Sequence, residues 1–142
     1  MNLNKFTIKS QEALQNGQEI ASSYGNQILE PEHVLAALVQ DPGGTVLPIL
    51  GKIGVNAGTL KLKVNELLER LPKVSGAALG QQGMSQALGR VLDAALKQAQ
   101  GLHDEYVSTE HILLGLLDAQ ESPAGRLLKE QGVTSDAVLL VL

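Results

Sequence analysis

The chain contains one short phrase twice, and this duplication limits its possible folds more than any other feature. PEHVLAAL, residues 31–38, returns as TEHILLGL, residues 109–116, and the offset between His33 and His111 is 111 − 33 = 78 residues. Repeated units pack together to bury apolar faces that a single unit cannot hide. We therefore expect two related halves that share one core. The same offset gives further identities, at Ala21 and Ala99, Glu32 and Glu110, Leu35 and Leu113, Leu38 and Leu116, Leu50 and Leu128, Gly54 and Gly132, and Val55 and Val133.

Apolar residues in the first half recur at the spacing of helices with one buried face. Thr7 can cap a first helix that runs to about Tyr24, and a second helix begins at Pro31 and runs to about residue 40. DPGG, residues 41–44, stops the second helix. A short third helix over residues 45–52 is expected next. A fourth helix carries Leu60, Val64, Leu67 and Leu68 and ends at Pro72.

The second half repeats this order of elements. Ser85 is the expected cap of a helix that carries Leu88 to Leu102, and Ser108 opens the helix that contains His111. Ser122 and Pro123 open a short helix, and Gly132 precedes a last apolar segment. The predicted fold is therefore all-α, with about eight helices in two four-helix repeats related by a pseudo-twofold. We divide this single domain into repeat one (1–72), a connector rich in small residues (73–83) and repeat two (84–142).

Composition excludes several classes of function. The chain has 142 residues, 44% of them hydrophobic, and no cysteine, so we expect one domain without disulfides. Its longest apolar run, ILLGLL, is far shorter than the roughly 20 residues of a membrane-spanning helix. The N-terminus resembles no secretion signal, so a cytoplasmic location is expected. With 15 acidic and 11 basic residues and only Phe6, Tyr24 and Tyr106 as aromatics, nucleic-acid binding is not expected.

The repeated Glu-His pairs are the most tempting candidates for chemistry. Adjacent residues on a helix point about 100° apart, so Glu32 and His33 cannot easily converge on one metal ion, and no metal site is expected. His33 and His111 are expected to bond near helix starts through their ring nitrogens. A first-turn carboxylate is favoured by the helix dipole, which explains Glu32 and Glu110 without any function. Alternatively, these two acids also engage cationic groups of a partner.

The sequence does not match two common catalytic motifs. GGTVLPILGKI, residues 43–53, has the wrong glycine spacing for a P-loop and lacks its hydroxyl residue. GMSQA, residues 83–87, lacks the closing glycine of a nucleophile elbow, and Ser85 is better explained as a helix cap. We therefore expect no catalytic residues and no cofactor in this chain. Asp104 and Glu105 precede the second Glu-His helix and, with Glu110, could form an acidic rim.

Four segments resemble the N-terminal domain of Clp-type AAA+ chaperones: FTIKSQEALQNGQEIA, LEPEHVLAAL, RLPKVSG and DEYVSTEHILLGLL. RLPKVSG favours the ClpB-type branch. The resemblance covers essentially the whole chain and implies the substrate-binding domain of an ATP-driven disaggregase that recovers stress-aggregated proteins with the DnaK system. It also implies a homohexameric full-length protein that binds ATP and magnesium in modules beyond Leu142, whereas this domain alone is expected to be a monomer. The alternative is an adaptor-docking domain of a ClpA-like or ClpC-like protease ATPase.

The resemblance also implies site residues for binding unfolded or aggregated polypeptides. Thr7, Asp104 and Glu110 match polar family positions implicated in chaperone activity, and Val91 and Leu92 are candidates for an apolar groove. Glu32 is a secondary candidate, because glutamates matching Glu32 and Glu110 recognise phosphorylated arginine in the ClpC branch. An apolar groove with acids at its rim would hold a polypeptide weakly enough to release it.

Overall fold

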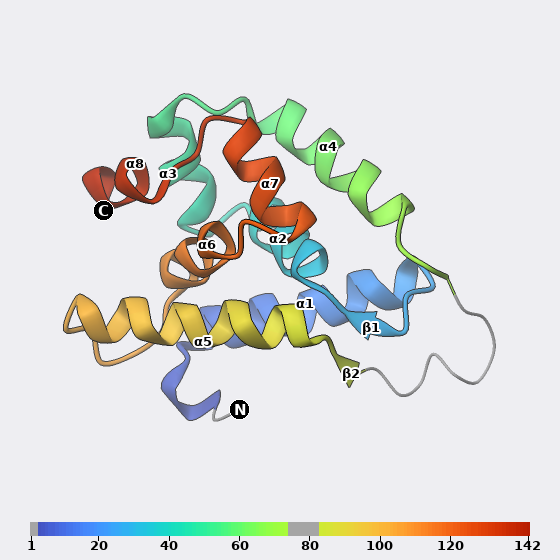
Figure 1. Ribbon diagram of the computed structural model, residues 1–142, viewed down its shortest axis with the longest axis horizontal. Coiled ribbons are helices and arrows are strands. Elements are labelled where there is room, and N and C mark those ends of the chain that lie inside the picture. The colour runs from blue at the N-terminus through green and yellow to red at the C-terminus, as the bar shows by residue number, and fades with distance from the viewer. Residues whose placement is uncertain (1–2, 74–82) are drawn as a thin grey trace.

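The computed structural model describes residues 3–73 and 83–142, and these residues form a helical domain (Figure 1). The all-α prediction is confirmed. The other described elements are a 3₁₀ turn, Leu3–Lys5, and two strands of two residues each, β1 (Ile28–Leu29) and β2 (Gly83–Met84). The eight α-helices within the described residues are α1 (Ile8–Ser23), α2 (Pro31–Gln40), α3 (Val46–Ile53), α4 (Ala57–Glu69), α5 (Gln86–Gly101), α6 (Thr109–Asp118), α7 (Pro123–Glu130) and α8 (Ser135–Val141).

Helix starts follow local sequence chemistry closely. Thr7 accepts a hydrogen bond from the backbone N–H of Ser10, and Ser85 accepts one from Leu88, as the sequence predicts. Each satisfies a backbone donor that has no partner inside the helix. Prolines stand at the first helical position of α2 and α7, where a missing N–H costs nothing. Asn56, Ser122 and Thr134 cap α4, α7 and α8 in the same way.

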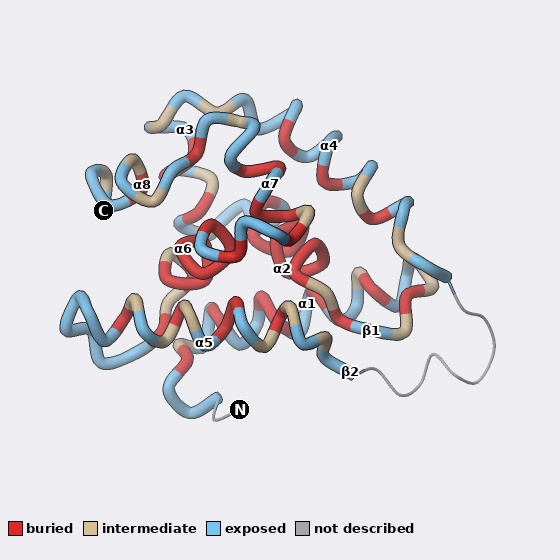
Figure 2. Tube along the Cα trace, viewed as in Figure 1, coloured by how far each residue is buried: buried red, intermediate tan, exposed pale blue. Residues whose placement is uncertain are grey.

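The repeated phrase forms the two central helices of the molecule (Figure 2). Every residue of α2 from Pro31 to Val39 is buried. In α6 every residue from Thr109 to Leu117 is buried except Glu110, which is half-buried. Helix α1 packs on α2, and α5 packs on α6. The phrase is therefore apolar on nearly all sides because neighbours surround both helices. None of the described helices combines the length and apolar character needed to cross a membrane.

The two halves exchange short backbone pairings. Phe6, which precedes α1, forms a parallel bridge with Val107, which precedes α6. Met84 of β2, which precedes α5, pairs in parallel with Leu29 of β1, which precedes α2. At the 78-residue offset, Met84 is the counterpart of Phe6 and Leu29 is the counterpart of Val107. The second bridge is therefore the first bridge with the two halves interchanged. This reciprocity is what a pseudo-twofold relation requires. Two-residue strands show no alternation in sequence, so the sequence could not reveal them.

Candidate functional site

Three of the predicted polar site residues lie around the Phe6–Val107 bridge. The backbone N–H of Thr7 donates to the Val107 carbonyl at 3.0 Å, and the Val107 N–H donates to the Lys5 carbonyl at 2.7 Å. Val107 is three residues from Asp104 and three from Glu110 in the sequence. The fold therefore brings the N-terminal segment to the loop that contains Asp104 and to the start of α6.

We call this region the bridge surface, and its members are at least partly accessible to solvent. Its apolar side chains are exposed, since Ile8 is 77% exposed, Tyr106 50% and Leu3 41%. An aromatic side chain of this exposure often marks a contact surface. Three acids accompany one base, so the surface has a net negative charge. Its residues are Leu3, Lys5, Thr7, Ile8, Asp104, Glu105, Tyr106 and Glu110.

Asp104 is tied to the buried ring of His111. The His111 Nε2 lies 2.9 Å from Asp104 Oδ2, and the backbone N–H of Ser108 donates to His111 Nδ1 at 2.9 Å. Because a backbone N–H can only donate, Nδ1 is the acceptor, and Nε2 carries the hydrogen that is donated to Asp104. The ring therefore joins the loop to the first turn of α6.

Repeat one contains the same arrangement with a neutral partner. The backbone N–H of Glu30 donates to His33 Nδ1 at 2.9 Å, and His33 Nε2 lies 2.8 Å from Asn26 Oδ1. Asn26 Nδ2 in turn donates to the Pro72 carbonyl at 3.0 Å. Asn26 and Asp104 occupy equivalent positions at the 78-residue offset. The structure bears out the prediction that both histidines bond near helix starts.

Ser108, His111 and Asp104 are the three residue types of a serine hydrolase triad, a combination that the sequence analysis did not consider. Ser108 Oγ lies 2.8 Å from His111 Nδ1. That nitrogen, however, already accepts the backbone N–H of Ser108 itself. In a triad the base nitrogen must be free to remove the serine proton. The geometry is that of a helix cap, with His111 three residues after the cap.

The expectation that Val91 and Leu92 line an exposed apolar groove is wrong for this structure. Both side chains are 0% exposed, because this face of α5 packs in the core against α6. Their helical spacing indicated a buried face, and that interpretation is the correct one. Ile8 and Tyr106 on the bridge surface are among the exposed apolar residues instead. Each directly follows or precedes a residue of a bridge or cap, outside any periodic stripe, and this position is the signal that sequence reasoning missed.

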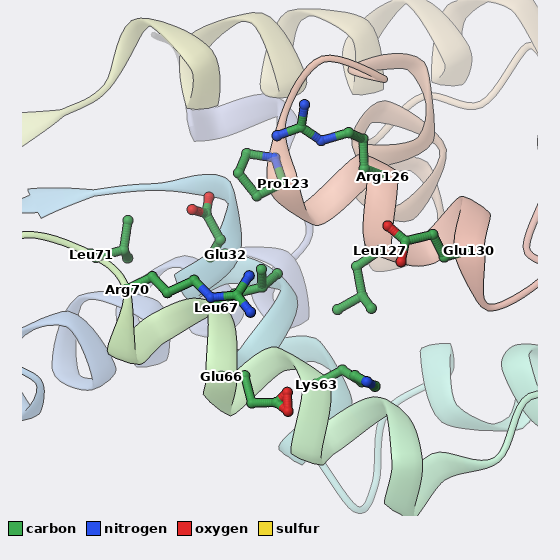
Figure 3. A pocket seen from close by; sticks show the side chains of 10 residues that line it. All are labelled: Glu32, Lys63, Glu66, Leu67, Arg70, Leu71, Pro123, Arg126, Leu127 and Glu130. Atoms are coloured by element: carbon green, nitrogen blue, oxygen red, sulfur yellow. The ribbon is translucent and has the colours of Figure 1, made fainter.

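Glu32 lies apart from the bridge surface, at a cleft of about 460 Å³ between α4 and α7 (Figure 3). Glu32 is only 4% exposed. Leu67 and Leu127 supply apolar walls. Three cations and two further acids also line the cleft, yet among the described residues Glu32 has no ion-pair partner. The charged residues besides Glu32 are Lys63, Glu66, Arg70, Arg126 and Glu130.

Burial shifts the pKa values of Glu32 and His33, the Glu-His pair of the first repeat. Burial raises the pKa of the Glu32 carboxyl above 4.5, and the nearby charge of Glu30 raises it further. Burial lowers the pKa of His33 from 6.5 to about 4. In both cases the neutral form is favoured, as expected when a charged form would lose its hydration. His33 is therefore neutral at neutral pH and suited to its two hydrogen bonds.

These shifts predict opposite effects of pH on stability. Below pH 6.5 the unfolded chain binds a proton at His33 and the folded chain does not, so the free energy of unfolding falls as the pH is lowered toward 4. Glu32 acts in the other direction, because its raised pKa adds stability as the pH falls. In a Glu32→Gln variant we expect a loss of about 2 kcal/mol between pH 7 and pH 5, measured by urea denaturation. A Glu32→Gln, His33→Gln double variant should show a flatter profile, and equal slopes would contradict the assignment to His33.

No cluster of three His, Asp or Glu side chains in residues 3–73 and 83–142 could hold a metal ion. What the geometry offers is binding. The bridge surface combines protruding apolar groups with carboxylates, and the cleft places one buried carboxylate among apolar walls.

Comparison with known proteins identifies the family. The model of the Clp repeat (R) N-terminal domain matches residues 5–131. The chain is 43% identical over 135 residues to the chaperone protein ClpB of Porphyromonas gingivalis, a match that covers 94% of this chain and 15% of that protein. It is 38% identical over 138 residues to the chaperone protein ClpB of Vibrio cholerae, covering 97% of this chain and 16% of that protein. The chain thus spans about a sixth of the length of these relatives.

Among solved structures, the Hsp104 N-terminal domain from Candida albicans superposes with a TM-score of 0.80 at 29% identity. This match covers 94% of this chain and 86% of the Hsp104 chain. The helical fold, the matched segment and these relatives agree with the resemblance that the motifs indicate. The chain belongs to the Clp repeat (R) N-terminal domain family, and its likeness to the N-terminal domains of ClpB-type chaperones is confirmed.

Proposed function

We propose that this chain is a non-catalytic docking domain that binds unfolded or aggregated polypeptides on the bridge surface. The observation that carries the proposal is the protrusion of Ile8 and Tyr106 beside three carboxylates, at the joint between the two halves. Unfolded chains expose apolar and basic side chains together, and this surface complements both. Thr7 adjoins Ile8 in the sequence, and Asp104 and Glu110 lie on either side of Tyr106, so the residues that the family resemblance implies are sequence neighbours of these exposed apolar groups.

Binding at such a surface is weak, and weakness suits a docking domain. Few apolar side chains are available for burial, and exposed charge pairs add about 0–1 kcal/mol each. Association also has to offset the loss of freedom of a flexible polypeptide. We therefore propose dissociation constants in the micromolar range or weaker, on the order of −8 kcal/mol or less favourable. A domain that passes its substrate to a motor must release it.

The test uses two unrelated unstructured peptides that carry leucine and arginine, each with a version in which glutamate replaces arginine. We expect the chain to bind both arginine peptides in calorimetry and to bind the glutamate versions at least about fivefold more weakly, because the surface is acidic. Glu110→Gln should weaken binding of the arginine peptides and reduce its dependence on salt.

Glu121→Gln is the matched control, since Glu121 is an exposed glutamate beyond the other end of α6. It should leave binding unchanged. Strict preference for one folded adaptor, with no binding of either peptide, would overturn the proposal and favour the adaptor-docking alternative. The ClpB relatives do not favour that alternative.

Glu32 is retained as a secondary contact for a cationic group of the polypeptide. Its carboxylate is desolvated without a cationic partner among the described residues, and a buried charge gains most from such a partner. The apolar walls of the cleft would cover the stem of a basic side chain. The mixed charges at its rim limit this role, because Arg70 and Arg126 would repel the same ligand.

We extend the proposal to the longer protein of which this chain would form the N-terminal part. That protein would be a cytoplasmic homohexamer that binds ATP and magnesium in other modules and recovers stress-aggregated proteins with the DnaK system. This domain alone would be a monomer without a cofactor. The length of the ClpB relatives supports the proposal, since this chain matches only about a sixth of each.

A further inference from the structure

The loop over residues 102–108, which presents Tyr106, is held by hydrogen bonds near both of its ends. At its far end the Val107 carbonyl accepts hydrogen bonds from the Thr7 N–H at 3.0 Å and from Ser10 Oγ at 2.9 Å. Nearer its start, Asp104 accepts from the buried His111 ring at 2.9 Å. The exposed residues between these two points are therefore held in place by Asp104 on one side and by the N-terminal segment on the other.

The backbone of this loop is not one that its sequence adopts readily. His103, directly before Asp104, has a φ of 60°, and it is the one non-glycine residue with a positive φ among the described residues. The equivalent residue in repeat one is Gly25, with a φ of 72°. A left-handed histidine is strained and persists only where the surroundings impose it. Backbone bonds at the end of α5 impose it, since the His103 N–H donates to the Gln100 carbonyl at 3.1 Å and the Asp104 N–H donates to the Ala99 carbonyl at 2.9 Å. The bond between Asp104 and His111 follows directly after this turn.

Repeat one shows what this bond needs chemically. Asn26, the equivalent of Asp104, presents a neutral amide oxygen to His33 at 2.8 Å. Both rings use the same tautomer, since a backbone N–H donates to Nδ1 in each. An oxygen acceptor at this position therefore suffices for the link, and a negative charge is not required.

The inference that follows rests on the proposed polypeptide-binding function. The geometry assigns different roles to the polar residues of the bridge surface. We propose that Asp104 is a positioning residue that acts through His111 to hold the 102–108 loop, whereas Glu110 is the residue that meets the polypeptide. Asp104 has its Oδ2 engaged by the ring. Glu110 is half-buried in the first turn of α6 and makes no side-chain hydrogen bond or ion pair within residues 3–73 and 83–142.

Thr7 belongs with Asp104 in this division. Its hydroxyl donates to Ser10 Oγ at 3.0 Å and accepts from the Ser10 N–H at 3.1 Å. The Ser10 hydroxyl then donates to the Val107 carbonyl. Thr7 thus orients the Ser10 hydroxyl, which holds the far end of the loop. Its effect on binding is therefore also indirect and acts through Ser10.

The test compares conservative and truncating variants at each position, with the arginine peptides described above as ligands. Asp104→Ala should bind at least about fivefold more weakly than the unaltered chain, and Asp104→Asn should bind clearly more tightly than Asp104→Ala, because it loses the charge but keeps the oxygen that accepts from His111. Thr7→Ser and Thr7→Ala should behave as the corresponding pair. Glu110→Gln should weaken binding as much as Glu110→Ala, because there the charge itself is used.

A second readout examines the link without any ligand. In Asp104→Asn the hydrogen on His111 Nε2 should stay protected from exchange with solvent in nitrogen-15 spectra, and hydrogen exchange at the Val107 amide should match that of the unaltered chain. In Asp104→Ala the Ser108 N–H still holds the ring in the same tautomer, but the Nε2 hydrogen should lose its protection and the Val107 amide should exchange faster. If Asp104→Asn binds as weakly as Asp104→Ala while its ring signal is intact, Asp104 contacts the polypeptide by its charge and the inference is overturned.

Unchanged binding of Asp104→Ala would also overturn it. If the unaltered chain binds neither peptide, the proposed function fails, and the ring and exchange data then decide separately whether Asp104 holds the loop.

Discussion

Replacing Leu113 with alanine is expected to lower the free energy of unfolding by about 2–5 kcal/mol, as typical core truncations do. Leu113 is 0% exposed in α6. Its counterpart Leu35, also 0% exposed, lies in α2, and both belong to one continuous cluster of buried side chains. Removing either side chain leaves a cavity that surrounding helices can fill only in part.

Both variants should weaken the same cooperative transition, because the two halves share their core. Urea denaturation followed by circular dichroism gives the loss, and hydrogen exchange of amides in α1 and α5 reports on each half separately. Leu140→Ala is the control, since Leu140 is 86% exposed, and its effect should stay within about 0.5 kcal/mol. If Leu113→Ala accelerated exchange in α5 but left α1 protected to the original level, the halves would be independent units.

Gly115→Ala should also destabilise the chain, by about 1–3 kcal/mol or more, because the methyl group has no room. A Cβ at Gly115 would lie 2.4 Å from the backbone carbonyl oxygen of Val91 and 3.3 Å from the Cβ of Ala95. Helix α5 would therefore have to move away from α6. The better helix propensity of alanine, worth about 1 kcal/mol, offsets this cost only in part.

The matched control lies where α1 packs on α2. A Cβ at Gly17 would lie 3.4 Å from Leu29 Cδ1 and 3.5 Å from the His33 carbonyl oxygen, which are ordinary contact distances. Gly17→Ala should therefore be neutral or stabilising by up to about 1 kcal/mol. Thermal unfolding of both variants gives the comparison. Equal destabilisation by the two substitutions would show that the close approach at Gly115 is not the cause.

Most of the helical framework could be predicted because its signals are local. Thr7 and Ser85 cap their helices as their sequence contexts indicate, and Pro31 opens α2. The repeat at 78 residues predicted a shared core, because a repeat can be recognised from the sequence pattern alone. The family resemblance then named the fold and the class of chaperone.

The features that escaped prediction depend on contacts between distant segments. The Phe6–Val107 bridge joins residues about a hundred positions apart, and two-residue pairing carries no periodicity. Val91 and Leu92 could be placed on an apolar face, but a sequence cannot say whether another helix covers that face. The burial of Glu32 follows from the approach of α7 to α4, which no local signal records.

The reciprocal pairing at Phe6 and Met84 has a consequence for how such a duplicated chain can change over time. Each copy supplies the residue that pairs with the other copy before a central helix, so neither half can form these backbone pairings alone. A substitution at Phe6 or Met84 therefore has to fit the backbone of the opposite half. Sequence changes at these positions in one copy are therefore limited by the structure of the other copy.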